Sequence, residues 1–208
     1  MLLDADDSQL VLVDYQARLM PVIFENELVL ANAVRLARMA QALAVPVWST
    51  AQSPDKLGPN VPEVQAAIDA AGGRTLAKMH FCAVGDGLGD WLRPPVRKAL
   101  AGGNARSLPK HLQKAAPTEE AAARGAIVIA GCEAHVCLMQ TALGLLEEEF
   151  DVWVVTDACS SRTERNRDAA FDRLAGAGAE LVTTEMVAFE WLRTAEHPAF
   201  KEVLGLVK

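Results

Sequence analysis

The stretch "AIVIAGCEAHVCLMQTALGLLEEEFDVWVVTDA", residues 126–158, decides the fold class. Its apolar run at 126–131 predicts a strand, and the spacing of apolar residues over 135–149 predicts an amphipathic helix. The run at 151–158 then predicts a second strand. A helix between two strands is the usual crossover that joins parallel neighbours in a sheet. This part of the chain therefore predicts a parallel α/β fold.

The same alternation continues through most of the 208 residues. Further strands are expected at 9–16, 45–50, 74–81 and 179–184, separated by helices at 26–44, 61–72 and 165–178. Six strands with helical crossovers predict a three-layer α/β sandwich, and the length suits a single domain over 1–208. Gly and Pro interrupt residues 82–124, which are expected to form an elaborated crossover.

Composition narrows the class of partner. The formal net charge is −7 and no basic stripe stands out, which disfavours a nucleic-acid partner. No apolar run approaches the roughly 20 residues that a membrane span needs, and the acidic N-terminus does not resemble a signal peptide. The four cysteines are then expected to be reduced thiols in a cytoplasmic protein.

The cluster of Cys132, His135 and Cys137 has several interpretations. A zinc site is disfavoured, because no second pair of ligands with short spacing is present. Cys132 and Cys159 directly follow apolar strands, so simple core packing is favoured for both. Cys137 falls in the first turn of a predicted helix, where free N–H groups and the helix dipole would lower its pKa and favour a nucleophilic thiolate.

Two further residues stand where predicted strands end. Ligands of open α/β sheets bind outside the carboxyl ends of the strands, which is where Asp14 and Lys78 are expected. Asp14 could accept the proton of the Cys137 thiol while Lys78 stabilises the charge. Either residue alone is weak evidence, since Asp14 could form a turn and Lys78 could be a solvated charge at a strand end.

Several motifs together resemble the isochorismatase-like cysteine hydrolases, above all the isochorismatase domain-containing proteins. They are "VLVDYQ", "LAKMHFCA", "DACSSR" and the helix start "CLMQTA" with a glycine six residues before its cysteine. The resemblance implies a six-stranded parallel sheet in the order 3-2-1-4-5-6. It also implies a catalytic triad of Asp14, Lys78 and Cys137, a cis peptide between Cys132 and Glu133, and an oxyanion site formed by the N–H groups of Glu133 and Cys137.

The resemblance also places a substrate pocket, for which the candidates are Tyr15, Gln16, Phe81, Cys82 and His135. Gln16 could orient Asp14 or cap the next segment, and Cys82 stands where the family often has serine. Nicotinamidases of this family bind a metal through Asp and His residues after the second strand. The stretch "STAQSP" at 49–54 lacks them, so no catalytic metal and no cofactor are expected.

The expected function is hydrolysis of a C–N bond in a small amide or related molecule through a thioester on Cys137. An isochorismatase-type ether hydrolase, a catalytically silent binding or scaffold protein and a peroxide-sensing thiol protein are the alternatives. The expected partners are a small-molecule substrate and further copies of the chain in a homo-oligomer of two or more subunits.

Overall fold

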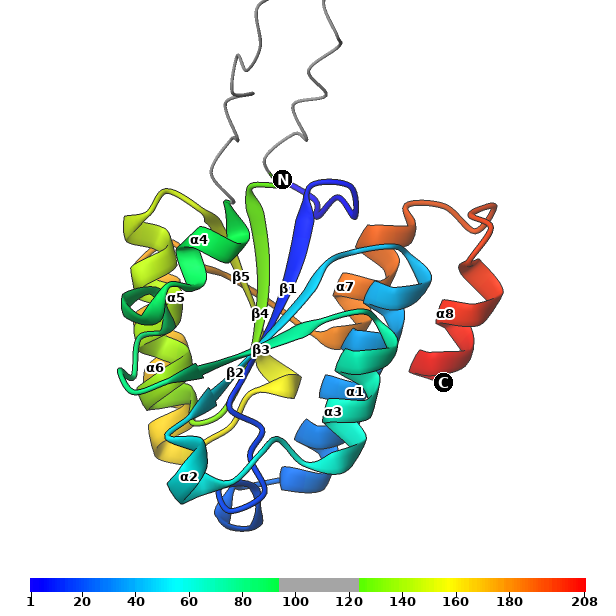
Figure 1. The fold of residues 1–208 in the computed structure, drawn as a ribbon. Coiled ribbons are helices and arrows are strands. Elements are labelled where there is room, and N and C mark those ends of the chain that lie inside the picture. The colour runs from blue at the N-terminus through cyan, green and yellow to red at the C-terminus, as the bar shows by residue number, and fades with distance from the viewer. Residues whose placement is uncertain (94–123) are drawn as a thin grey trace, which may run out of the picture.

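A computed structural model describes residues 1–93 and 124–208, so most of the expected crossover at 82–124 lies outside the described residues. Six parallel strands form one sheet, in the order β3-β2-β1-β4-β5-β6 (Figure 1). They are β1 Ser8–Val13, β2 Val47–Gln52, β3 Arg74–Lys78, β4 Ala126–Gly131, β5 Asp151–Val155 and β6 Glu180–Val182. The predicted fold class and strand order are confirmed.

Helices cover both faces of the sheet, which gives three layers (Figure 1). One face carries α1 Asn26–Ala42, α3 Pro62–Ala70, α7 Thr184–Leu192 and α8 Phe200–Val207. The other carries α4 Leu88–Leu92, α5 Met139–Glu147 and α6 Glu164–Gly176. Shorter pieces are α2 Pro54–Leu57, the 3-10 turns η1 Met20–Val22, η2 Ala83–Asp86 and η5 Thr156–Ala158, and the π-helical turn η4 Ala134–Leu138.

The central strands explain why the sheet is covered on both sides. All six residues of β1 and all six of β4 are buried, as expected for strands that pack against a helix layer on each face. Helix α1 turns Val29, Ala33, Leu36 and Ala40 inward at spacings of three and four. No helix among residues 1–93 and 124–208 combines the length and the apolar character needed to span a membrane.

Strands β1, β3, β5 and β6 end two or three residues earlier than the sequence predicted, whereas β2 ends two residues later, at Gln52. Strand β1 stops at Val13 because Asp14 adopts a left-handed conformation with φ 53°, which leaves the sheet geometry. Strand β3 stops at Lys78, so residues 79–81 become a turn. The predicted strand at 151–158 ends at Val155 and continues as the turn η5. Polar side chains therefore gather where β1, β2 and β3 end.

Candidate active site

A buried ion pair joins the ends of two strands on either side of β2. The Nζ atom of Lys78 lies 2.7 Å from Oδ2 of Asp14, and neither side chain is exposed. Lys78 is therefore not the solvated charge at a strand end that the sequence left open. Two charges removed from water need further polar partners, since their mutual attraction alone rarely compensates the lost hydration.

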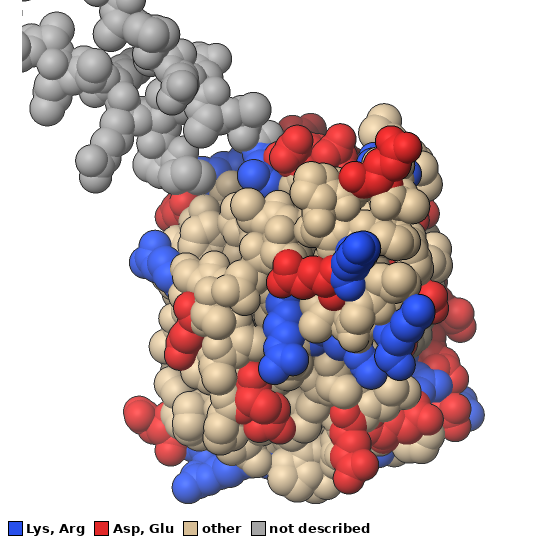
Figure 2. Space-filling view, turned by 90° about the vertical axis from the view of Figure 1, so that its right-hand side faces the viewer, with Lys and Arg blue, Asp and Glu red and all other residues tan. Residues whose placement is uncertain are grey.

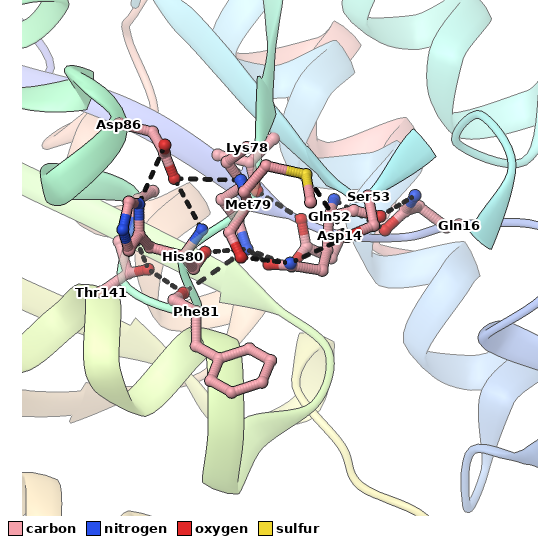
Figure 3. Close-up of polar contacts among 12 residues, drawn as sticks. Asp14, Gln16, Gln52, Ser53, Lys78, Met79, His80, Phe81, Asp86 and Thr141 are labelled. Atoms are coloured by element: carbon pink, nitrogen blue, oxygen red, sulfur yellow. Dashed lines mark hydrogen bonds and ion pairs between the residues drawn. The ribbon is translucent and has the colours of Figure 1, made fainter. Parts of the chain in front are cut away.

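Strand β2 supplies those partners. The Thr50 hydroxyl donates to Oδ1 of Asp14 at 2.7 Å. The Lys78 ammonium donates to Oε1 of Gln52 at 2.7 Å (Figure 3). The backbone carbonyls of His80 and Phe81 lie 3.4 Å from the same ammonium. Sequence reasoning placed Thr50 and Gln52 at the end of a strand, where ligands of open α/β sheets bind, but assigned neither of them a role.

Cys137 lies on the turn η4, which follows β4 and continues into α5. Strand β4 is the neighbour of β1 on the side away from β2, so Cys137 comes from the other side of β1 than Lys78 does. Cys137 is only 6% exposed, and Asp14 and Lys78 both lie close enough to influence the pKa of its thiol. The structure thus brings together all three residues for which the sequence predicted a proton-transfer set.

The charge state of Cys137 differs from the prediction. The pKa of the Cys137 thiol is raised from 9.0 to about 12, first by burial and then by the Asp14 carboxylate, and Lys78 opposes them only in part. The helix start was expected to lower this pKa, and that expectation is wrong for the resting site because desolvation and a neighbouring anion dominate. Cys137 is therefore a protonated thiol until a base takes its proton.

A tight turn carries the chain from β4 into the Cys137 helix. Gly131 has φ 154°, and a Cβ atom there would meet the Val13 carbonyl oxygen and lie 2.6 Å from the Val13 Cβ. The Cys132–Glu133 peptide is cis, as the resemblance implied. Cys132 N–H donates to the Val13 carbonyl at 2.9 Å, so β1 holds this turn directly beside Asp14.

The other side of the turn is held by the loop after β5. Ala134 N–H donates to the Ser160 carbonyl at 2.7 Å, and the Glu133 carboxylate accepts from Nε of Arg162 at 2.9 Å. Within the described part of the chain, the N–H of Glu133 has no acceptor. It is therefore available to a group that enters the site, as an oxyanion donor must be.

Two of the predicted pocket residues lie behind the site. Tyr15 is fully buried, and its hydroxyl donates to the Ala158 carbonyl at 2.6 Å. Gln16 is also fully buried, and its side chain bonds the backbone of Gln52 and the Gly58 carbonyl. The Gln16 side chain bonds Gln52 and Gly58 rather than Asp14, so it links the end of β2 to the end of α2 and acts on the ion pair through Gln52.

The remaining predicted pocket residues occupy different positions. Phe81 is 52% exposed at the edge of the site, in the same turn as Met79, which is 67% exposed. Cys82 packs on α5, where a Cβ atom at Gly144 would lie 2.8 Å from its sulfur. His135 is half-buried, and its Nδ1 lies 2.9 Å from the Ser161 hydroxyl. Cys132 and Cys159 are buried in the core, as predicted.

Three hollows of about 410, 450 and 490 Å³ are lined by described residues, and Asp14, Lys78 and Cys137 line none of these three. The candidate site is identified by its chemistry rather than by its volume, since a strongly perturbed pKa with specific charged neighbours is typical of functional sites. In residues 1–93 and 124–208, no three His, Cys, Asp or Glu side chains are grouped to hold a metal ion.

Comparisons with known proteins agree with this architecture. The family model for the isochorismatase domain matches residues 8–186. Isochorismatase domain-containing protein 2A of Mus musculus is 34% identical over 203 residues, which cover 98% of this chain and 84% of that protein.

Solved structures are similar over almost the whole chain. The MAR1 ribonuclease of Caenorhabditis elegans has a TM-score of 0.82 at 28% identity, covering 100% of this chain and 92% of that one. YcaC of Pseudomonas aeruginosa, solved with hexane-2,5-diol and covalent acrylamide, has a TM-score of 0.77 at 27% identity, covering 99% of this chain and 91% of that one. YcaC of Escherichia coli, described as an octameric hydrolase of unknown specificity, has a TM-score of 0.75 at 26% identity, covering 99% of this chain and 95% of that one.

Proposed function

The chain belongs to the isochorismatase family, and from that premise we propose that it is a cysteine hydrolase whose reacting groups are Asp14, Lys78 and Cys137. The observation that carries the proposal is a buried carboxylate–ammonium pair close enough to a buried thiol to shift its pKa. A protonated thiol is a poor nucleophile, and a carboxylate beside it supplies the missing base.

The proposed reaction begins when the Cys137 sulfur attacks the carbonyl carbon of a small amide as Asp14 takes the thiol proton. The carbonyl oxygen becomes an oxyanion, which the N–H groups of Glu133 and Cys137 stabilise. When the C–N bond breaks, Asp14 gives its proton to the leaving nitrogen and a thioester remains. Water then attacks the thioester with Asp14 as base, which releases the carboxylic acid and restores the thiol. Lys78 stays charged throughout and limits the build-up of negative charge.

A relative supports the nucleophilic part of this proposal. YcaC of Pseudomonas aeruginosa was solved with covalent acrylamide, so that protein contains a group that forms a bond with a small electrophile. We propose that Cys137 does the same here. The exposed Met79 and Phe81 at the edge of the site favour a small, uncharged substrate with an apolar part.

We do not propose that this chain cleaves RNA, although one relative is named a ribonuclease. The net charge is −7, and Figure 2 shows acidic and basic side chains interspersed over one face, without a continuous basic stripe. Binding of a polyanion depends on concentrated positive charge.

We also propose that the protein is a homo-oligomer. A relative is described as octameric, and this chain exposes Leu2, Met186 and Phe189 beside one another along a groove at α7. Apolar side chains grouped at one surface are typical of a contact with a further subunit.

The test of function is a screen of small amides and carbamoyl compounds, with intact-mass detection of an acyl adduct on Cys137. The wild-type protein should turn over at least one compound, and Asp14→Asn and Cys137→Ala should lose that turnover. Asp69→Asn, which neutralises an exposed carboxylate on α3, is the matched control and should behave as wild type. Full turnover by both Asp14→Asn and Cys137→Ala would contradict the proposal, and would leave ether hydrolysis without a thiol nucleophile as the better explanation.

A further inference from the structure

Two residues of β2 lie between the members of the buried ion pair, and each bonds one of them. In the sheet register, Thr50 pairs with Val13, the residue before Asp14, and Gln52 pairs with Lys78 itself. We infer that Thr50 and Gln52 are positioning residues, which fix how Asp14 and Lys78 meet the Cys137 thiol. This inference rests on the proposed function and assigns the orientation of its base to β2.

Thr50 determines which carboxylate oxygen is free for chemistry. Its hydroxyl donates to Oδ1 of Asp14, which blocks rotation of the carboxylate and leaves Oδ2 facing Lys78. The backbone adds a second constraint, because Asp14 N–H donates to the Thr50 carbonyl at 3.3 Å. A carboxylate held at one oxygen and along its backbone presents the other oxygen in a single direction.

Gln52 does the same for the ammonium. Its Oε1 accepts from Lys78 while its Nε2 donates to the Met79 carbonyl at 2.8 Å. A carbonyl needs a donor and an ammonium needs an acceptor, so these two partners permit only one orientation of the amide. The Gln52 backbone is fixed in turn by Gln16, through bonds of 2.9 and 3.0 Å.

The spacing of these residues explains how one strand serves both groups. Thr50 and Gln52 are two positions apart, so their side chains leave the strand on the same face. Ser49 comes one position before Thr50 and therefore points to the other face, where its hydroxyl accepts a hydrogen bond from Asn60. Ser49 is equally buried, so it provides a matched control for removing a hydroxyl from β2 without touching the ion pair.

The experiment compares Thr50→Val, Thr50→Ser, Gln52→Met and Ser49→Ala, with acrylamide as the probe. The rate of adduct formation on Cys137 near neutral pH is followed by intact mass, and melting temperatures are recorded alongside. Thr50→Val and Gln52→Met should react about 10- to 100-fold more slowly, as expected when a reacting group is misplaced. Thr50→Ser, which keeps the hydroxyl, should stay within about threefold of wild type.

A purely structural role would not produce this pattern. Ser49→Ala should lower the melting temperature about as much as Thr50→Val and yet keep the wild-type rate. The inference is overturned if Thr50→Val and Gln52→Met react like wild type, or if Thr50→Ser is as slow as Thr50→Val. If the wild-type protein itself forms no adduct on Cys137, the proposed function fails, and the inference fails with it for that separate reason.

Discussion

Neutralising Asp14 should lower the pKa of the Cys137 thiol and also lower the rate of turnover. Asp14→Asn keeps the shape of the side chain but removes the negative charge that raises the pKa of the neighbouring thiol. The thiolate should therefore form more easily in the variant. Turnover should nevertheless fall, because the variant has lost the base that removes the thiol proton during attack.

The size of the effect follows from the site. The rise in the pKa of Cys137 from 9.0 to about 12 corresponds to about 4 kcal/mol, and burial is its largest cause. The Asp14 carboxylate is the second cause after burial, so removing its charge should lower the pKa by part of this rise, about 1 to 2. At about pH 10, the thiolate fraction should then rise from about 1% to between about 10% and 50%.

The assay is a pH titration of thiolate absorbance in the ultraviolet, taken as the difference between each protein and its Cys137→Ser counterpart. Asp69→Asn provides a charge-matched control and should titrate as wild type. Turnover of the substrate found in the screen should fall by about 10²- to 10⁴-fold in Asp14→Asn, the usual contribution of a general base.

The result that would refute this reasoning is a Cys137 pKa in Asp14→Asn that is unchanged or higher than in wild type. It would mean that the carboxylate does not act on the thiol electrostatically. Lys78→Met offers a second check with the opposite sign, because removing the cation should raise the pKa of Cys137 further.

Other predictions concern stability and assembly. Gly131→Ala should lower the free energy of unfolding, measured in urea, by about 3 kcal/mol or more, because the added Cβ would meet Val13. Gly176→Ala, where a Cβ would meet nothing within 4 Å, should be neutral or slightly stabilising. Equal effects of the two substitutions would contradict this account. Although burial raises the pKa of Asp86, hydrogen bonds from two backbone N–H groups of the turn after β3 bring it below 3.8. Asp86→Ala should therefore lose about 1 to 3 kcal/mol at neutral pH, and the difference from wild type should vanish as the pH falls through that lowered pKa; a constant difference across pH would exclude this cause. Phe189→Ser should shift the mass measured by light scattering toward smaller assemblies, and an unchanged mass would remove α7 as a subunit contact.

The fold was predicted well because each strand and helix has a local pattern of apolar residues that identifies it. The alternation of apolar runs and amphipathic stretches identified all six strands, and the family resemblance supplied their order. Strand ends were less accurate, because the last residues of β1 and β3 differ from the turns after them in backbone conformation rather than in hydrophobicity. The left-handed φ of Asp14 is an example, since nothing in "VLVDYQ" marks where pairing stops.

The site was predictable in part for a related physical reason. Asp14, Lys78 and Cys137 stand out because each is a chemically reactive residue directly at the end or start of an element. Thr50 and Gln52 could not be assigned, because their role depends on which strands are neighbours and on their register. The pKa of Cys137 was predicted in the wrong direction because a helix start can be read from sequence, whereas burial beside a carboxylate cannot.

The buried pair also constrains how any loss of activity can be interpreted. Asp14 and Lys78 compensate each other's charge without help from solvent, so removing one leaves the other buried and unpaired, which typically destabilises a protein by about 3 to 5 kcal/mol. A variant at either position can therefore lose turnover by unfolding as well as by losing chemistry. Thr50 and Gln52 are neutral, and their substitution leaves the charge balance intact. Variants of Thr50 and Gln52 therefore change how Asp14 and Lys78 are oriented while both charges remain. Variants of Asp14 or Lys78 cannot do this, because they remove one of the two charges.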